Sequence, residues 1–167
     1  MNLEAKACSE SRAVKTSLVL PPDTNNHGTL FGGTLLAHID EVSSIAALKH
    51  ARKNVVTASM DSVDFLSPVT LGQTITIEAF VTYAHRTSME IFVKVITENV
   101  LTSEEKVCNT AFLTFVALDE NGKPDVVPAV YPETEQEKAL HEAAIERAEQ
   151  RKMRRKLSKE FAEKFGF

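Results

Sequence analysis

The sequence predicts an α+β domain in which one long buried helix is wrapped by an antiparallel sheet. Two observations lead to this prediction. Residues 30–52 form a largely apolar stretch of helical length without proline. From residue 55 to residue 118 the hydrophobic pattern changes to the alternation that is typical of strands, interrupted by short turns. One helix followed by several consecutive strands is the order expected for a helix packed on an antiparallel sheet.

The segments before the strands place the helix in the middle of the fold. A short apolar run at residues 17–20 ends at Pro21 and Pro22, and residues 23–28 form a polar loop rich in turn formers. The helix that follows is apolar on most of its circumference, which requires cover on most sides. Its apolar side chains are Leu35, Leu36, Ile39, Val42, Ile45, Ala46, Ala47 and Leu48.

Four strands are expected, over residues 55–65, 74–83, 88–98 and 107–118. The breaks between them are a proline segment at 67–69, a turn at 85–87 and a charged turn at 104–106, and residues 119–124 end the sheet. The strands carry bulky apolar residues and few charges. We therefore expect a strongly curved sheet around the helix, with its other surface covered as well.

A C-terminal helical extension, residues 129–167, is predicted beside a main domain at residues 12–128. Apolar residues recur at helical spacing in the extension, at Met153, Leu157, Phe161 and Phe165, and Lys and Arg cluster at residues 151–156. We expect this stripe to dock the helix on its own subunit or on a neighbouring one. The alternative is a basic patch that binds a polyanion or a phosphate of a ligand. In either case we expect the extension to be dispensable for chemistry.

Length and charge narrow the classes of function. The chain has 167 residues, a formal net charge of −4 and a pI of about 5.8, which fits one ordinary domain and gives no sign of a nucleic-acid partner. Cys8 and Cys108 show neither metal spacing nor a disulfide framework. The N-terminus has no apolar signal core, and no apolar run approaches the roughly 20 residues of a membrane span. We expect a cytoplasmic protein with no membrane partner.

The chemistry is expected where the polar loop meets the helix. Gly32 and Gly33 allow a close backbone approach, and the unpaired N–H groups of a helix start can hold a developing oxyanion. The alternative is tight packing of these glycines against the sheet. Asp40 lies about two turns further along the apolar helix, where an unpartnered carboxylate is costly. It is either a catalytic carboxylate or one that faces solvent or bonds nearby backbone, and Glu41 is then the surface acid.

The remaining polar candidates have ordinary structural alternatives. Asn25 precedes the helix, where asparagine usually forms a turn or a cap, and its functional alternative is to orient a water or a thioester.

The five histidines lack the spacing of metal ligands, and no serine-elbow, zinc or phosphate-loop motif is present. We therefore expect neither a metal nor a redox cofactor.

Residues 23–41 closely resemble the bacterial acyl-CoA hydrolases of the hotdog fold and the related acyl-CoA thioesterases of animals. The motif is an asparagine, a glycine and a Phe-Gly-Gly run leading to an acidic residue, here Asn25, Gly28, Phe31, Gly32 and Gly33 before Asp40. Residues 56–59, 63–65 and 86–89 match later family segments, so the similarity covers about residues 12–118.

The resemblance implies a hotdog fold, acyl-CoA hydrolysis and assembly into a homohexamer as a trimer of dimers. Asp40 matches the catalytic aspartate, acting as general base or nucleophile, and Asn25 matches the asparagine that assists it from the opposing subunit. Gly32 and Gly33 match the glycines near the thioester. Coenzyme A is part of the substrate, and no other cofactor is implied. The positions that match segments lining the acyl-CoA site are Thr57, Ser59, Arg86 and Ser88.

Two other classes of function remain open from the sequence. A non-enzymatic acyl-CoA sensor of the same fold is possible because a fold does not determine function, although no helix-turn-helix candidate precedes residue 12. A hotdog dehydratase normally uses a histidine–acid pair, whereas the matching positions here are Asn25 and Asp40. The chain-length preference of the substrate does not follow from the sequence.

Overall fold

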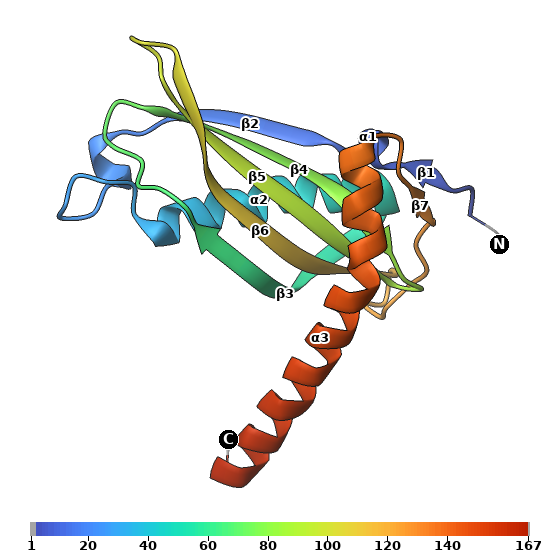
Figure 1. Ribbon diagram of the computed structural model, residues 1–167. Coiled ribbons are helices and arrows are strands. Elements are labelled where there is room, and N and C mark those ends of the chain that lie inside the picture. The colour runs from blue at the N-terminus through green and yellow to red at the C-terminus, as the bar shows by residue number, and fades with distance from the viewer. Residues whose placement is uncertain (1–2, 167) are drawn as a thin grey trace.

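The computed structural model describes residues 3–166 and has the expected α+β architecture (Figure 1). A 3₁₀ turn, Pro21–Asp23, separates β2 from α2. The helices are α1 (Cys8–Ser11), α2 (Gly32–Ala51) and α3 (Glu135–Phe165). The strands are β1 (Lys6–Ala7), β2 (Ala13–Leu18), β3 (Asn54–Phe65), β4 (Thr74–Ala84), β5 (Ser88–Asn99), β6 (Glu104–Leu118) and β7 (Val130–Tyr131).

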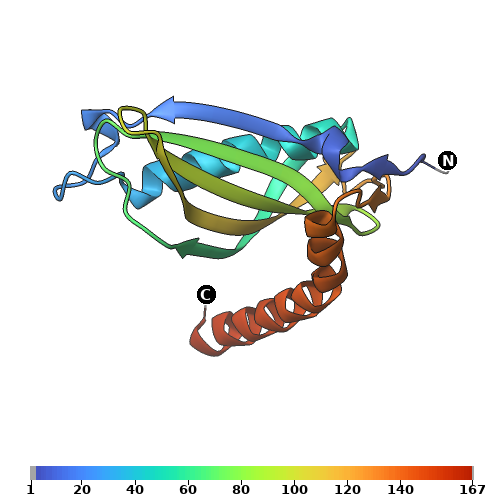
Figure 2. The same ribbon diagram turned by 45° about the horizontal axis from the view of Figure 1, so that its top comes forward.

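Five strands form one antiparallel sheet in the order β2-β4-β5-β6-β3. Helix α2 runs along one face of this sheet, and α3 crosses the opposite face near one end before projecting beyond it (Figures 1 and 2). Strands β1 and β7 form a separate parallel pair, which ties the N-terminal residues to the segment before α3. β3 and β2 are therefore the two edges of the main sheet.

The sheet buries only one side of α2. Leu35, Ile39, Val42 and Ala46 are buried against the strands, as their helical spacing requires. On the other side of the same helix, large apolar side chains such as Ile45, at 42% exposed, remain accessible. The expectation of a helix buried on most sides is therefore wrong for the single chain, and part of α2 needs cover from outside it.

The expected turn at residues 104–106 is wrong. These three residues belong to β6 and pair with residues 97–99 of β5, and the hairpin turn lies at residues 100–103, where Ser103 has a φ of 55°. The side chains of Glu104, Glu105 and Lys106 are all exposed. A strand pair whose side chains face solvent tolerates a run of charges, so composition alone misplaced the turn.

Helix α3 docks on the sheet, but not by the predicted stripe. Met153, Leu157, Phe161 and Phe165 are each more than half exposed. The C-terminal end of α3 projects beyond the sheet (Figure 1). Docking uses buried Ala144 and the arginines that follow it as far as Arg154, which pair with carboxylates of the sheet. The expectation that the stripe docks α3 on its own sheet is therefore wrong, while docking on a neighbouring subunit stays a prediction.

The buried histidine at the end of α2 makes the stability of the fold sensitive to pH. His50 is fully buried, its Nε2 donates to the carbonyl oxygen of Pro128 at 2.9 Å, and its Nδ1 has no partner among the described residues. Burial is the main reason why the pKa of His50 lies below its ordinary value.

We predict that acid destabilises this fold through His50. Below the ordinary histidine pKa of about 6.5, the unfolded chain takes up a proton that the folded chain resists, so stability is present above this pH and falls as the pH drops toward about 5. The measurement is the Tm between about pH 7.5 and 5 for wild type and His50→Gln. His85→Gln, at an exposed position, is the control. An acid-side fall in Tm that is equally steep in all three proteins would contradict the prediction.

Candidate active site

Asp40 and Thr57 form the polar contact between α2 and the edge strand β3. The Thr57 hydroxyl donates to Oδ1 of Asp40 at 2.8 Å. Asp40 is half-buried, while Thr57 is exposed because β3 pairs only with β6 and its other edge is open. The contact holds one carboxylate oxygen of Asp40 beside an edge strand of the sheet.

The neighbouring acid has a different setting. Glu41 accepts a hydrogen bond from Nζ of Lys15 at 2.5 Å and is more than half exposed. This bond with Lys15 is the main reason why the pKa of Glu41 lies below its ordinary value. The two adjacent carboxylates therefore face different surroundings, as expected from the angle of about 100° between successive helix residues. Glu41 is the surface acid of the pair.

Asn25 holds the shape of the loop before α2. Its Oδ1 accepts from the backbone N–H groups of His27 and Thr29, at 2.9 and 3.2 Å, and its Nδ2 donates to the Thr29 hydroxyl at 2.9 Å. The loop protrudes from the body of the chain (Figure 1). The turn-forming role of Asn25 is therefore present, and its partners are all within the loop rather than on Asp40 of the same chain.

The two glycines stand at the first turn of α2. Phe31 precedes the helix, and no side chain caps this end. A Cβ on Gly33 would approach the Phe31 ring to 2.5 Å, whereas a Cβ on Gly32 would make ordinary contact with the Phe65 ring at 3.5 Å. Close packing thus explains Gly33 in this structure. The uncapped N–H groups of the first turn remain available to a ligand oxygen.

A mostly apolar cavity of about 320 Å³ lies beside the start of α2. It is lined by Gly32, by Leu35 one turn later, by Phe65 at the end of β3, and by the segment that follows this strand as far as Val69. Apolar cavities of this kind accept hydrocarbon groups. The cavity does not include Asp40 or Asn25, so the single chain supplies only part of a site.

The remaining candidate residues are spread over other parts of the chain. Ser59 donates to Oδ1 of Asp61 at 2.6 Å instead of joining Asp40. Arg86 is exposed on the β4–β5 turn, and Ser88 lines a second cavity of about 490 Å³ between that turn and α3. A single chain therefore brings Thr57 to Asp40, but it does not bring Ser59, Arg86 or Ser88 to them.

Sequence reasoning missed two carboxylates, one buried and one partly buried, on the sheet face that α3 crosses. Glu90 on β5 is 2% exposed and pairs with Arg147 and Arg151 of α3, and Asp61 on β3 pairs with Arg154. The available signal was a glutamate within the apolar run at residues 89–93 of β5. Within residues 3–166 no group of three or more His, Cys, Asp or Glu side chains is placed to hold a metal ion. Among the described helices, none combines the length and apolar character of a membrane span.

Comparison with known proteins identifies the family. The thioesterase superfamily model matches residues 27–104. The uncharacterized acyl-CoA thioester hydrolase YkhA of Bacillus subtilis is 56% identical over 133 residues, which cover 80% of this chain and 77% of YkhA. The chain belongs to the acyl-CoA thioester hydrolases of the thioesterase superfamily. The cytosolic acyl coenzyme A thioester hydrolase of mouse is 38% identical, over 81% of this chain but only 36% of the mouse protein.

Solved structures of hydrolases in this family confirm the hotdog fold. The acyl-CoA hydrolase of Staphylococcus aureus, in complex with butyryl coenzyme A, coenzyme A and coenzyme A disulfide, has a TM-score of 0.93 and 47% identity over 98% of this chain and 99% of that chain. A hexameric acyl-CoA thioesterase in apo form has a TM-score of 0.89 and 52% identity over 91% and 97%. Alanine variants of the S. aureus hydrolase at an aspartate, an asparagine and a threonine also have this structure.

We predict that Asn25 stabilises its loop independently of any chemistry. Asn25→Ala removes three hydrogen bonds to residues 27 and 29, so the amide hydrogens there should exchange roughly tenfold faster. Native-state hydrogen exchange is the measurement. Asn26→Ala, at the exposed neighbouring position, should leave the rates unchanged. Unaltered exchange in Asn25→Ala would show that the loop keeps its shape without this side chain.

Proposed function

We propose that this protein is an acyl-CoA thioesterase that hydrolyses acyl-CoA to free CoA and a carboxylic acid. The supporting observation is the likeness to the S. aureus acyl-CoA hydrolase over nearly the whole chain. The three positions changed to alanine in that enzyme have the same spacing along the chain as Asn25, Asp40 and Thr57. Two of these three residues are in direct hydrogen-bond contact here.

In the proposed mechanism Asp40 is the general base. Thr57 holds Oδ1, and the second carboxylate oxygen takes a proton from a water molecule that attacks the thioester carbon. The N–H groups at the start of α2, around Gly32 and Gly33, stabilise the negative charge that develops on the carbonyl oxygen. The carbon–sulfur bond then breaks, and the proton held by Asp40 passes to the CoA thiolate. Direct attack by Asp40, giving an anhydride that water hydrolyses, is the alternative route.

The site is proposed to form between subunits of a homohexamer, arranged as a trimer of dimers. Two features of the single chain support this arrangement. The edge strand β3 is twelve residues long and largely exposed, and long free edges are normally paired or protected. The face of α2 that the sheet does not cover carries exposed apolar residues. Pairing of β3 with β3 of a second copy brings Asp40 to a subunit boundary, where Asn25 of the partner is proposed to assist it.

The remaining substrate contacts are assigned by family resemblance. We propose that Thr57, Ser59, Arg86 and Ser88 lie along the acyl-CoA site that two subunits form together. Coenzyme A enters as part of the substrate, and no separate cofactor takes part in the proposed mechanism. The cytoplasm is the proposed location, because acyl-CoA hydrolases of this kind include cytosolic relatives.

We predict that Asp40→Asn lowers kcat by about 10²–10⁴-fold, because asparagine keeps the size of the side chain but cannot take the proton. The measurement is release of the CoA thiol from a panel of acyl-CoA substrates. Glu41→Gln is the matched control, since it changes the adjacent acid whose partner is Lys15 on the surface. Turnover close to wild type in Asp40→Asn would remove Asp40 from the proposed role.

We also predict that the inactive variants Asn25→Ala and Asp40→Asn regain activity when their subunits are mixed. A dimer that combines one Asn25→Ala subunit with one Asp40→Asn subunit contains one site with both wild-type residues and one with neither. Random exchange should therefore restore about a quarter of wild-type activity. The assay follows CoA release after subunit exchange, which is monitored by mass. Continued inactivity despite complete exchange would place Asn25 and Asp40 of each site in the same chain.

A further inference from the structure

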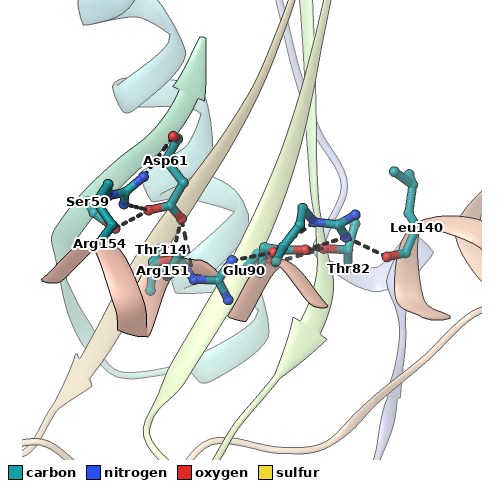
Figure 3. A network of polar contacts seen from close by, with 9 residues as sticks. Ser59, Asp61, Thr82, Glu90, Thr114, Leu140, Arg151 and Arg154 are labelled. Carbon is teal, nitrogen blue, oxygen red and sulfur yellow. Dashed lines mark hydrogen bonds and ion pairs between the residues drawn. The ribbon is translucent and has the colours of Figure 1, made fainter. Parts of the chain in front are cut away.

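Strand β3 makes two different polar contacts within five residues. Thr57 donates to Asp40 of α2, on one side of the sheet. Asp61 binds Arg154 of α3, on the opposite side (Figure 3). The strand thus connects the candidate base to the C-terminal extension, although α2 and α3 lie on opposite faces of the sheet (Figure 2).

Asp61 is held by side chains from three elements. Arg154 donates to its Oδ1 and also to its backbone oxygen, the latter at 2.9 Å. Thr114 of β6 donates to Oδ2 at 2.8 Å, and Nε of Arg151 lies 3.5 Å from the same oxygen. Ser59, within β3 itself, donates to Oδ1 at 2.6 Å. Both the side chain and the main chain of β3 are therefore fixed at this residue.

Helix α3 is anchored to the middle of the sheet by Arg147 and by Arg151, which also approaches Asp61. Arg151 reaches Oε2 of Glu90 at 2.5 Å, and Arg147 donates to both oxygens of Glu90, at 2.8 and 3.1 Å. Thr82 of β4 also donates to Glu90, at 2.8 Å. The Glu90 side chain is completely buried. A buried carboxylate with this many partners has one favourable geometry, so it sets the position of α3 on the sheet.

A β-bulge separates the two contacts of β3. Side chains alternate between faces along a regular strand, so Thr57 and Asp61, four residues apart, would otherwise face the same side. The pairing of β3 with β6 shifts register between Thr57 and Ser59, and again between Met60 and Ser62. These irregularities allow Thr57 to face α2 while Asp61 faces α3. Bulges redirect side chains in this way next to functional sites.

Within one chain, the bulged part of β3 is held outside α3 only by its pairing with β6 and by the bonds that Asp61 accepts from Ser59 and Thr114. It pairs with β6 on one side only, and Ala58 and Met60 beside it are exposed. In an edge strand the extra residue of a bulge leaves the ladder locally unpaired. Within the chain, α3 therefore supplies the clamp on this segment through its arginines. The proposed pairing with a second copy would hold the outer edge of β3 but not the Asp61 side chain. Release of the clamp should therefore let the strand shift at Asp61, and the direction of Thr57 should change with it.

We propose that Arg154, supported by Arg151, is a positioning residue for the thioesterase reaction: by clamping Asp61 it fixes the β3 bulge that aims Thr57 at Asp40. The inference rests on the proposed function, and it adds the C-terminal helix to the machinery of that site. It runs against the expectation, drawn from the sequence, that the extension is dispensable for chemistry. Removal of α3 should slow turnover even where the substrate still binds.

A double-mutant cycle between Arg154 and Thr57 tests the inference. Arg154→Ala should lower kcat about tenfold and leave KM within about twofold, and Thr57→Val should have a similar effect on kcat. In the Thr57→Val background, Arg154→Ala should change kcat by less than about twofold, because both changes remove the same alignment of Asp40. A role of Arg154 in stability alone would not produce this dependence on Thr57.

Arg155→Ala is the matched control, because Arg155 is the next residue of α3, is exposed, and has the same charge. Its kcat should stay within about twofold of wild type. Oligomeric mass and Tm are measured for every variant. If Arg154→Ala lowers either, Arg154→Lys takes its place, since lysine keeps the charge but cannot hold the Asp61 carboxylate and carbonyl together. Its kcat should fall several-fold, with the same dependence on Thr57.

If the wild-type chain hydrolyses acyl-CoA, either of two results would overturn the inference. One is a kcat for the Arg154 variant equal to that of Arg155→Ala. The other is an equal fall in kcat with threonine and with valine at residue 57, because α3 would then act on turnover by a route that does not pass through Thr57. A wild-type chain that releases CoA from no acyl-CoA would contradict the proposed function instead, and the inference would fall with it.

Discussion

The apolar surface of α2 is the constraint on which the rest of this structure depends. A helix that is apolar on most of its circumference cannot be left in water, and the curved sheet covers only the side of Leu35, Ile39 and Val42. The remaining apolar face needs a second subunit. Because Asp40 lies on the same helix, the proposed assembly also brings the candidate base to a subunit boundary. Helix α2 therefore packs on the sheet, carries the apolar face proposed to meet a second subunit, and carries the candidate base.

Helix α3, on the face of the sheet opposite α2, constrains the edge strand β3. An edge strand with irregular pairing is poorly determined by its own ladder, and β3 is such a strand. The polar contacts with α3 supply the missing constraint, because arginine forks fix a carboxylate in direction as well as in distance. Alongside these pairs, Arg147 stacks on the ring of Phe112 at 4.2 Å. The sheet therefore has an apolar contact layer toward α2 and a mixed, partly ionic one toward α3.

Much of the fold followed from the sequence because its signals are local. The apolar run at residues 30–52 predicted α2 to within two residues, and alternation located the start of β5 at Ser88. Asp40 and Asn25 were found through a motif and Thr57 through a separate matching segment, whereas the contact of Thr57 with Asp40 was not predicted. Their roles in catalysis stay a prediction.

The errors have a common physical cause, which is that some features depend on distant partners. The charges at residues 104–106 suggested a turn because the strand opposite them is not visible in a local pattern. The apolar stripe from Met153 suggested the docking face of α3, while the real docking face depends on Glu90 and Asp61, which are 57 and 93 residues from Arg147 and Arg154. Period-two counting also fails at a bulge. No local rule would have shown that Thr57 and Asp61 face opposite layers.

The burial of Glu90 limits how this extension is inherited. If one partner of a buried ion pair is lost, the other charge remains uncompensated, at a cost of about 3–5 kcal/mol. Substituting Glu90 or its arginines one at a time is therefore expected to give a much less stable protein. A C-terminal helix moved onto a sheet that lacks these two carboxylates would leave its arginines without partners. The extension is thus not self-sufficient, because its docking depends on residues of two strands far away in the chain.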